Sequence, residues 1–344
     1  MKFDVVVGNP PYQESAKGES TKDTPVYSYF YDLSEKISLK YCLISPARFL
    51  FNAGSTSKDW NTKMLTDKHV KVLHYEQDSS VIFPGTDITG GIAVLYRNQD
   101  IDFGTIGVFT SFSELNSILQ KVTKLTDITL DSIVSNRGQY RYSDKIYEDF
   151  PLEMKKISDR RIASNAFTKL PELFTDSKPH DHSEYIQIFG RMDSDRIYKW
   201  FKRDYLSEPD TLEKYKVILP KANGSGAIGQ KSSTPLIGEP MVLGPLVGFT
   251  ETFISIGPFD NANEAQNALK YVKSKFARTM LGVLKITQDN PKNKWEKVPL
   301  QDFTIESDID WTTPISEIDK QLYKKYGLSA TEIEFIETKV KAMD

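Results

Sequence analysis

Four consecutive residues near the start of the chain, Asn9-Pro10-Pro11-Tyr12, could hold an amino group beside a flat ring. The Asn9 amide oxygen and the Pro10 carbonyl are two acceptors that can bind the two hydrogens of one NH2 group. Because each proline fixes its own φ and restricts the residue before it, this loop is held extended. The Tyr12 ring could stack on a heterocycle, a contact worth about 1 to 3 kcal/mol on a nucleobase. The pattern favours a base lifted out of a duplex.

An apolar run, Val5-Val6-Val7-Gly8, leads directly into this loop. A short apolar run that ends at turn residues predicts a buried strand. In α/β proteins, ligands bind at the loops that follow the carboxyl ends of strands. The sequence therefore predicts a site at the carboxyl end of this strand. The alternative is a strand followed by a purely structural Pro-Pro turn.

The longer stretch Phe3-Asp4-Val5-Val6-Val7-Gly8-Asn9-Pro10-Pro11-Tyr12 resembles the catalytic motif of DNA methyltransferases that act on the exocyclic amine of adenine, in the gamma arrangement of bacterial restriction-modification enzymes. The resemblance implies that Asn9 and Pro10 hold the amine and face the methyl group of S-adenosylmethionine. It also implies that Tyr12 is one face of a base sandwich, in a catalytic loop that includes Pro11.

The same resemblance implies a second aromatic residue in a Phe-Pro loop before a later strand. Phe83, within Ser79-Ser80-Val81-Ile82-Phe83-Pro84, matches that position. It would stack on the base opposite the motif tyrosine. The alternative is a core residue that anchors the loop.

The resemblance covers roughly residues 1–98 and begins at the catalytic motif itself. In this family the cofactor-binding strand and its Gly-rich loop precede that motif, and only eight residues precede Asn9 here. The downstream stretch Asn223-Gly224-Ser225-Gly226-Ala227-Ile228-Gly229 contains no G-x-G-x-x-G. We therefore expect a fragment, or one subunit of a split enzyme whose partner supplies the cofactor half. The alternative is a non-catalytic DNA-binding subunit that retains the base pocket.

The composition is that of an ordinary soluble globular protein: 344 residues, 39% hydrophobic and 26% charged. No apolar run approaches the roughly 20 residues of a membrane span, and the N-terminus lacks a signal-peptide layout. Cys42 is the single cysteine, so a bacterial cytoplasmic location is expected. His180 and His182 are two ligands without a third, which does not make a zinc site. We also find no carboxylate and lysine pattern typical of a nuclease.

The first part of the chain, residues 1–107, is predicted to be α/β, with a partial Rossmann-like sheet. Strands are expected over residues 41–45, 69–75 and 91–96, and helices after Thr24-Pro25 and over residues 58–67. If the strands are parallel, the segment after Ser45 lies at the same edge as the catalytic loop.

Residues 108–300 are predicted to be a mixed α+β domain, similar to the target-recognition domains that follow the catalytic domain in these enzymes. Strands are expected over residues 185–191, 196–203 and 215–221, with one or two more between 240 and 255. Asn261-Ala262-Asn263-Glu264 predicts a helix start, and the apolar spacing continues to Met280. Residues 301–344 are expected to form two acidic helices.

Charge is segregated along this second part. Residues 268–297 contain seven Lys and one Arg against Asp289 and Glu296, whereas residues 301–344 contain ten acidic residues against five Lys. A local basic patch matters more for phosphate contact than the net charge of -3. A solvated helix face is the alternative. The predicted contacts to double-stranded DNA are Arg137, Arg141, Lys221, Asn223, Arg278, Lys285, Gln288 and Lys292.

Overall fold

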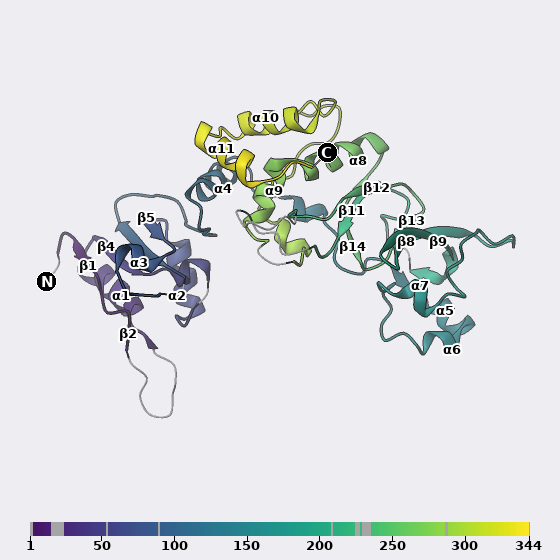
Figure 1. The fold of residues 1–344 in the computed structure, drawn as a ribbon, viewed down its shortest axis with the longest axis horizontal. Helices are drawn as coiled ribbons and strands as arrows, with labels where there is room; N and C mark the ends of the chain where they lie inside the picture. Colours follow the sequence, from purple (N-terminus) through teal and green to yellow (C-terminus); the bar gives the residue numbers. More distant parts are fainter. Residues whose placement is uncertain are drawn as a thin grey trace. The chain divides into compact units, whose positions relative to one another are not determined.

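The computed structural model describes residues 3–14, 24–52, 54–88, 90–207, 209–223, 228, 235–285 and 288–343. The chain divides into two compact units, Met1–Asn116 and Ser117–Asp344 (Figure 1). The predicted boundary at residue 107 therefore lies within the first unit. Most of the Gly-rich stretch after Asn223 lies outside the described residues.

A four-stranded sheet organises the first unit, in the order β1-β4-β6-β5. β1 is parallel to β4, whereas β6 is antiparallel to both β4 and β5. The unit is thus α/β with a mixed sheet, and the fully parallel arrangement considered from the sequence is wrong. The strands are β1 (Val6–Gly8), β4 (Lys40–Pro46), β5 (Val70–Glu76) and β6 (Ile92–Asn98).

The valine run is less buried than predicted. Val5 is 48% exposed and Val7 is 73% exposed. β1 is the edge strand of this sheet and pairs through β4 alone in the described part of the chain. An edge strand has a neighbour on one side only, so apolar side chains do not by themselves make it a buried strand.

Helices of the first unit pack an aromatic core against β4. Rings of Tyr27, Tyr31, Phe49 and Trp60 contact one another at centroid distances of 5.0 to 6.3 Å. The segments are α1 (Tyr27–Ile37), the 3₁₀ helix η1 (Arg48–Phe51), α2 (Lys58–Thr66) and α3 (Ser79–Ile82), followed by α4 (Ser113–Leu125), which crosses the boundary between the units.

The start of α1 differs from the prediction. Thr24–Pro25 forms a short strand, β3, that pairs with β2 (Gln13–Glu14), and the helix begins at Tyr27 with Val26 as its N-cap. Strand pairing therefore outweighs the local capping preference of a threonine before a proline. The pairing also connects the end of the Asn-Pro-Pro-Tyr loop to the start of α1.

In its described residues, the second unit contains two three-stranded sheets and one two-stranded pair. β8 and β9 are joined by a tight turn in which Asp193 and Ser194 have φ of 50° and 75°. One sheet has the order β13-β8-β9 and the other β12-β11-β14. The strands are β7 (Arg141–Tyr142), β8 (Tyr185–Met192), β9 (Asp195–Lys202), β10 (Leu206–Ser207), β11 (Tyr215–Pro220), β12 (Met241–Leu243), β13 (Val247–Phe249) and β14 (Phe253–Phe259).

The helix predicted to run from Asn261 to Met280 is broken into two. Asn261 caps the first helix by accepting a hydrogen bond from the Glu264 N–H at 2.9 Å. Ser274 is extended, with ψ of 148°, and caps the second helix through the Ala277 N–H. The helices of this unit are η2 (Leu130–Ile133), α5 (Asp144–Asp149), α6 (Pro151–Met154), α7 (Ala166–Lys169), η3 (Arg203–Tyr205), α8 (Ala262–Lys273), α9 (Lys275–Gly282), η4 (Lys292–Trp295), α10 (Ile315–Lys325) and α11 (Ala330–Lys339).

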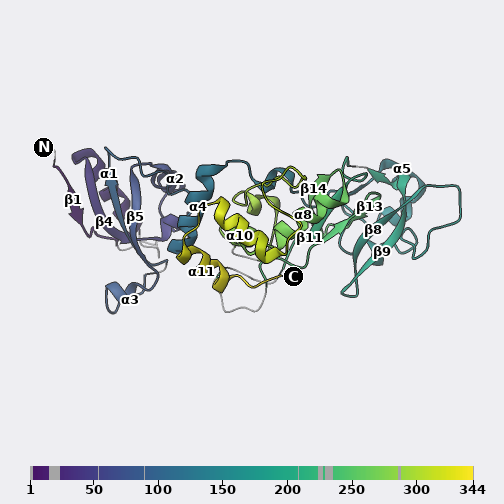
Figure 2. The same ribbon diagram turned by 90° about the horizontal axis from the view of Figure 1, so that it is seen from above.

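The two C-terminal helices, α10 and α11, drawn in yellow, pack against α8 and α9 within the second unit (Figure 2). The Phe276 and Tyr326 rings stack with centroids 4.9 Å apart, and Lys275 pairs with Glu337. Asp319 of α10 accepts backbone hydrogen bonds from Lys275 and Phe276 at the start of α9. The helices of this C-terminal segment therefore pack on the second unit.

Asp319 should make the stability of this packing depend on pH. Burial raises the pKa of its carboxyl from 3.8 to about 6, although the two backbone hydrogen bonds oppose the shift. The folded state then binds more protons than the unfolded state between these two pKa values, so stability falls as pH rises through that window. Relative to Asp319→Asn, the wild-type protein should lose on the order of 3 kcal/mol of unfolding free energy. Urea unfolding of both proteins at a series of pH values measures this difference, and parallel curves would contradict it.

Candidate functional site

The Asn-Pro-Pro-Tyr loop leaves the carboxyl end of β1, as predicted. Gly8 pairs with Leu43 of β4, which holds the start of the loop. The Tyr12 carbonyl accepts a hydrogen bond from the Val26 N–H at 3.0 Å, which holds its end. Pro10 is buried between these two anchors, whereas Asn9 is exposed. The loop therefore presents the Asn9 amide to solvent from a backbone that is fixed at both ends.

Tyr12 is half-buried, and its hydroxyl points into the protein. Burial raises the pKa of this hydroxyl, and the nearby Asn9 side chain acts to lower it. Even so, the hydroxyl makes no hydrogen bond of ordinary geometry, so Asn9 is close but not bonded to it. Beneath it lies the buried pair of Tyr31 and Ser45, whose hydroxyl oxygens are 3.0 Å apart. The hydroxyl end of the Tyr12 ring is thus buried without a hydrogen bond.

The ends of four described strands meet at the carboxyl edge of this sheet. β1 and β4 both end there, since they are parallel, and η1 follows β4 as expected from the sequence. Because β6 is antiparallel, it begins at the same edge, where Ile92 pairs with both Pro46 and Glu76. The segment between β5 and β6, which carries Phe83, therefore lies at the same edge of the sheet as Asn9.

Phe83 lies just after α3 and is half-buried. Its N–H donates to the Ser79 carbonyl at 2.8 Å, and its own carbonyl accepts from the Thr86 hydroxyl at 2.8 Å. Within the described residues, the rings of Tyr12 and Phe83 contact no other aromatic ring. The base sandwich therefore remains a prediction that rests on the shared sheet edge.

Gly91 is the last residue of the segment between β5 and β6, and its backbone conformation requires glycine. Its φ is 75°, and a Cβ there would lie 2.3 Å from the Glu76 carbonyl oxygen. The Gly91 carbonyl also accepts from the Ala47 N–H at 2.9 Å, which joins the connection after β4 to the start of β6.

An aromatic cluster that was not predicted from the sequence lies at this edge. The rings of Phe51, Tyr75 and Phe109 contact one another with centroids 5.3 to 5.7 Å apart, and Phe51 is 38% exposed. The exposed Phe51 follows the buried Phe49 and Leu50 in η1. Its position soon after β4, at the same sheet edge as Asn9, was a signal from which its place in the site could have been predicted.

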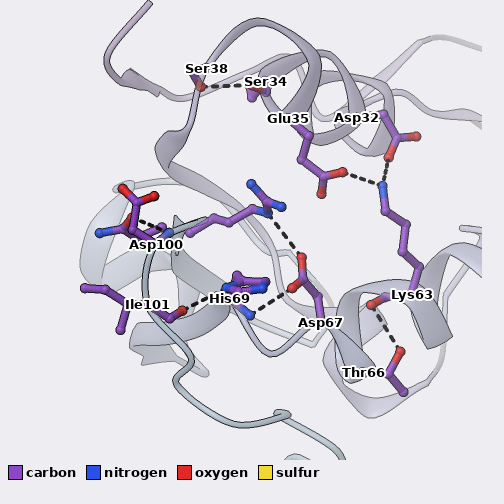
Figure 3. Close-up of polar contacts among 12 residues, drawn as sticks. Asp32, Ser34, Glu35, Ser38, Lys63, Thr66, Asp67, His69, Asp100 and Ile101 are labelled. Atoms are coloured by element: carbon purple, nitrogen blue, oxygen red, sulfur yellow. Dashed lines mark hydrogen bonds and ion pairs between the residues drawn. The ribbon is translucent and has the colours of Figure 1, made fainter.

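Polar contacts at the opposite edge of the sheet are structural (Figure 3). Lys63 bridges Asp32 and Glu35 at 2.8 and 2.7 Å, and so connects α2 to α1. Asp67 pairs with Arg97 at 3.1 Å, close to where β5 begins and β6 ends. This network fixes the helices on the sheet at the edge away from Asn9. In the part of the chain that the structure describes, His, Cys, Asp and Glu side chains form no cluster that could hold a metal ion.

In the second unit, several predicted DNA contacts gather around Glu251. Arg137 donates two hydrogen bonds to this carboxylate, at 2.9 and 3.1 Å, while Arg161 and Lys221 approach it at 3.6 and 3.9 Å. Burial acts to raise the pKa of Glu251, but together the Arg137 hydrogen bonds and the three positive charges lower it. Three cations share one carboxylate, with Asp159 as a further partner of Arg161.

Two antiparallel segments extend this cluster. Ala222 pairs with Asp289, the Asn223 N–H donates to the Gln288 carbonyl at 2.9 Å, and the Asn290 N–H donates to the Lys221 carbonyl at 2.8 Å. Four of the residues predicted to contact DNA are therefore neighbours. We call these four residues and Arg161 the basic cluster: Arg137, Arg161, Lys221, Asn223 and Gln288. Arg161 was not predicted from the sequence, although the Arg160-Arg161 pair was a visible signal.

The remaining predicted DNA contacts are distributed differently. Arg141 is exposed on β7, and Lys292 is half-buried in η4. Arg278 and Lys285 are 1% and 0% exposed, so both side chains lie inside the protein and neither can contact DNA directly. Both belong to a stretch that is rich in lysine and arginine. Arg278 lies in α9, whose residues 276–282 are all buried, whereas Lys285 follows this helix.

Part of the basic stretch is also neutralised within the unit. Lys273 pairs with Glu239 at 2.6 Å, Lys275 pairs with Glu337, and the Lys270 ammonium donates to the Trp311 and Thr313 carbonyls. The C-terminal segment thus contacts the basic stretch through the Lys275–Glu337 ion pair and through backbone carbonyls.

Comparison with known proteins gives a family match within the first unit and a longer match to a curated relative. Residues 1–83 match the family model described as Eco57I restriction-modification methylase. An uncharacterized adenine-specific methylase of Mycoplasma pneumoniae is 27% identical over 162 residues, which are 46% of this chain and 38% of that protein. These matches confirm the predicted resemblance. Both are to methylases and neither favours the alternative of a non-catalytic subunit, while the gamma arrangement stays a prediction.

Two solved restriction-modification enzymes show a weak likeness over 97% of the chain. The type IIG restriction endonuclease BpuSI is 11% identical, with a TM-score of 0.32 and 52% of its chain covered. The type IIL enzyme MmeI, solved in complex with DNA, is 10% identical, with a TM-score of 0.28 and 56% covered. The chain thus spans 38% of the methylase relative and about half of each solved enzyme.

None of the helices in the described part of the chain has the length and apolar composition needed to cross a bilayer.

Proposed function

We propose that this chain is part of an adenine-specific DNA methyltransferase of a restriction-modification system. The observation that carries the proposal is the Asn-Pro-Pro-Tyr loop, which is anchored at both ends, presents an exposed Asn9 amide and lies in the region matched by the methylase family. Asn9 Oδ1 and the Pro10 carbonyl would each accept one hydrogen of the amine of a flipped adenine. Tyr12 and Phe83 would stack on the two faces of the base.

These two acceptors would stabilise the positive charge that develops on the reacting nitrogen. As the amine forms its new bond to carbon, positive charge develops on the nitrogen and its N–H groups become stronger donors. Acceptors that are already in place stabilise this charge without reorganisation. S-adenosylmethionine would supply the methyl group. Asn9 and Pro10 would face that group, and we propose that a further segment or a partner subunit supplies the rest of the cofactor site.

The second unit would bind the target duplex through the basic cluster. Arginine can contact guanine or phosphate, and asparagine and glutamine can contact adenine edges. The Glu251 carboxylate orients Arg137 through two hydrogen bonds, which reduces the side-chain entropy lost on binding.

The experiment that tests the function is methyl transfer from radiolabelled S-adenosylmethionine to bacterial DNA. It should be run with this chain alone and with any methyltransferase segment encoded beside it. Activity only with the second component would establish a split enzyme, and activity of the chain alone would place the whole cofactor site within it. DNA binding without methylation in either mixture would contradict the proposal and favour a recognition subunit.

Arg137→Gln should weaken binding to duplex DNA by roughly tenfold, because one cation of the basic cluster is lost while Glu251 remains. If Arg137 contacts a phosphate, the slope of log affinity against log salt should also fall by about 1. Fluorescence anisotropy at several salt concentrations measures both quantities. Lys339→Gln, an exposed lysine of α11, is the matched control. Equal losses in the two variants would remove Arg137 from the proposed interface.

A further inference from the structure

A cavity of about 650 Å³ lies within the second unit, where the C-terminal helices meet α8 and α9. Four cationic side chains line it, and only two carboxylates, Asp319 and Glu337, lie among its lining residues. The cations are Lys270, Lys273, Lys275 and Arg278. Positive charge is therefore in excess among the side chains that line this pocket.

Arg278 is the central feature of this cavity. Its side chain is 1% exposed, and its Nε donates to the backbone carbonyls of Lys273 and Ser274 at 3.0 and 3.2 Å. These two bonds fix the plane of the guanidinium group. The Nη2 nitrogen, in contrast, is buried and has no hydrogen-bond partner. A buried charged donor without a partner is unfavourable, because it has lost its hydration and gained no hydrogen bond in exchange.

The neighbouring carboxylates do not satisfy this donor, because their oxygens bind elsewhere. Asp319 accepts the backbone N–H groups of Lys275 and Phe276 at 3.1 and 2.9 Å. Glu337 accepts from the Lys275 ammonium and from the Tyr323 hydroxyl. Asp319 therefore acts on Arg278 through its charge alone. Burial lowers the pKa of Arg278 to about 10, so the guanidinium stays charged at neutral pH.

Lys270 adds positive charge that no carboxylate neutralises directly. Its ammonium donates to the Trp311 and Thr313 carbonyls at 2.6 and 3.2 Å, which are uncharged acceptors. Lys273, by comparison, is paired with Glu239. The field inside the cavity is thus set by Lys270 and Arg278, and both are held in place by backbone carbonyls before any ligand enters.

We propose that this cavity binds an oxyanion group, a phosphate or a carboxylate, with Arg278 Nη2 as the direct donor. A charge-assisted hydrogen bond from a pre-oriented guanidinium is the strongest kind available to such a group. Apolar side chains of Leu269, Ile315 and Met343 also line the space and could contact the uncharged part of a small ligand. This site lies entirely within the second unit and does not depend on methyl transfer.

Calorimetric titration of the full chain with inorganic phosphate, and separately with acetate, tests the proposal. We expect saturable binding of at least one anion to the wild-type protein and a loss of at least tenfold in affinity in Arg278→Gln. Lys324→Gln removes an exposed lysine of α10 outside the cavity and should bind the anion normally. No saturable binding of either anion, or equal binding by Arg278→Gln, would overturn the proposal.

A measurement on the wild-type protein covers the case in which Arg278→Gln does not fold. The side-chain NMR signal of Arg278 should shift and its hydrogens should exchange more slowly when the anion binds. An unchanged signal at saturating anion would overturn the site. A short DNA duplex should not compete with phosphate for the Arg278 signal, because this buried side chain cannot contact DNA directly. Competition by the duplex would contradict a site for a free small anion.

Discussion

Replacing Asn9 with alanine is expected to lower the methyl-transfer rate of the active assembly by about 10²- to 10³-fold, the loss seen when one preorganised hydrogen-bonding group is removed from a developing charge. The Asn9 side chain is exposed at the end of a loop whose backbone is fixed by β1 and by the Tyr12 to Val26 hydrogen bond. Its truncation should therefore remove an acceptor without unfolding the loop.

Two variants make this prediction specific. Asn9→Asp keeps an acceptor oxygen in the same place and should retain more activity than Asn9→Ala. Gln77→Ala shortens an exposed amide side chain elsewhere in the first unit and should leave the rate unchanged. Base flipping, followed by the fluorescence of 2-aminopurine at the target position, separates binding from chemistry. An Asn9→Ala assembly that flips and methylates at the wild-type rate would rule out the role proposed for this residue.

Phe49→Ala should cost about 3 to 5 kcal/mol of stability in the first unit, because it removes a fully buried ring and leaves a cavity. Phe49 is 0% exposed and contacts the rings of Tyr27, Tyr31 and Trp60. Tyr31 in turn lies close enough to Tyr12 of the Asn-Pro-Pro-Tyr loop to interact with it electrostatically. Loss of the Phe49 ring should therefore also weaken the packing next to the Asn-Pro-Pro-Tyr loop.

Phe30→Ala is the matched control, since Phe30 belongs to α1 and is 37% exposed. The same deletion there should cost much less. Hydrogen exchange of the β4 amides reports on the first unit alone, and protection should fall strongly in Phe49→Ala and little in Phe30→Ala. Equal losses of protection would show that the aromatic core does not carry the stability of this unit.

Local patterns in the sequence were sufficient for most of the secondary structure. The alternation of Tyr41, Leu43 and Ser45 fits a strand with one buried face, and β4 buries those three residues. The paired strands β8 and β9, the capping side chain of Asn261 and the two C-terminal helices were also confirmed. Each of these features depends on residues that are close together in the chain, where period and capping chemistry are readable.

Features that depend on distant residues were predicted less well. The valine run was expected to be buried, but burial depends on what lies beside β1, and the described sheet has a neighbour on one side only. The helix expected through Met280 breaks at Ser274, where the Asp319 carboxylate of α10 binds the first N–H groups of α9. A tertiary hydrogen bond thus stabilises a second helix start that the apolar spacing did not reveal.

The residues of the candidate site could be predicted from the sequence alone, because Asn9, Pro10 and Tyr12 lie within four consecutive positions and the two prolines restrict the backbone between them. Only the tertiary structure decided which charged residues face solvent. It buried Arg278 and Lys285, paired part of the basic stretch with the C-terminal segment, and brought Arg137, Arg161 and Lys221 to one carboxylate. A sequence shows the sign of each charged residue but not its environment. The burial and the partners of that residue depend on segments that are far away in the chain.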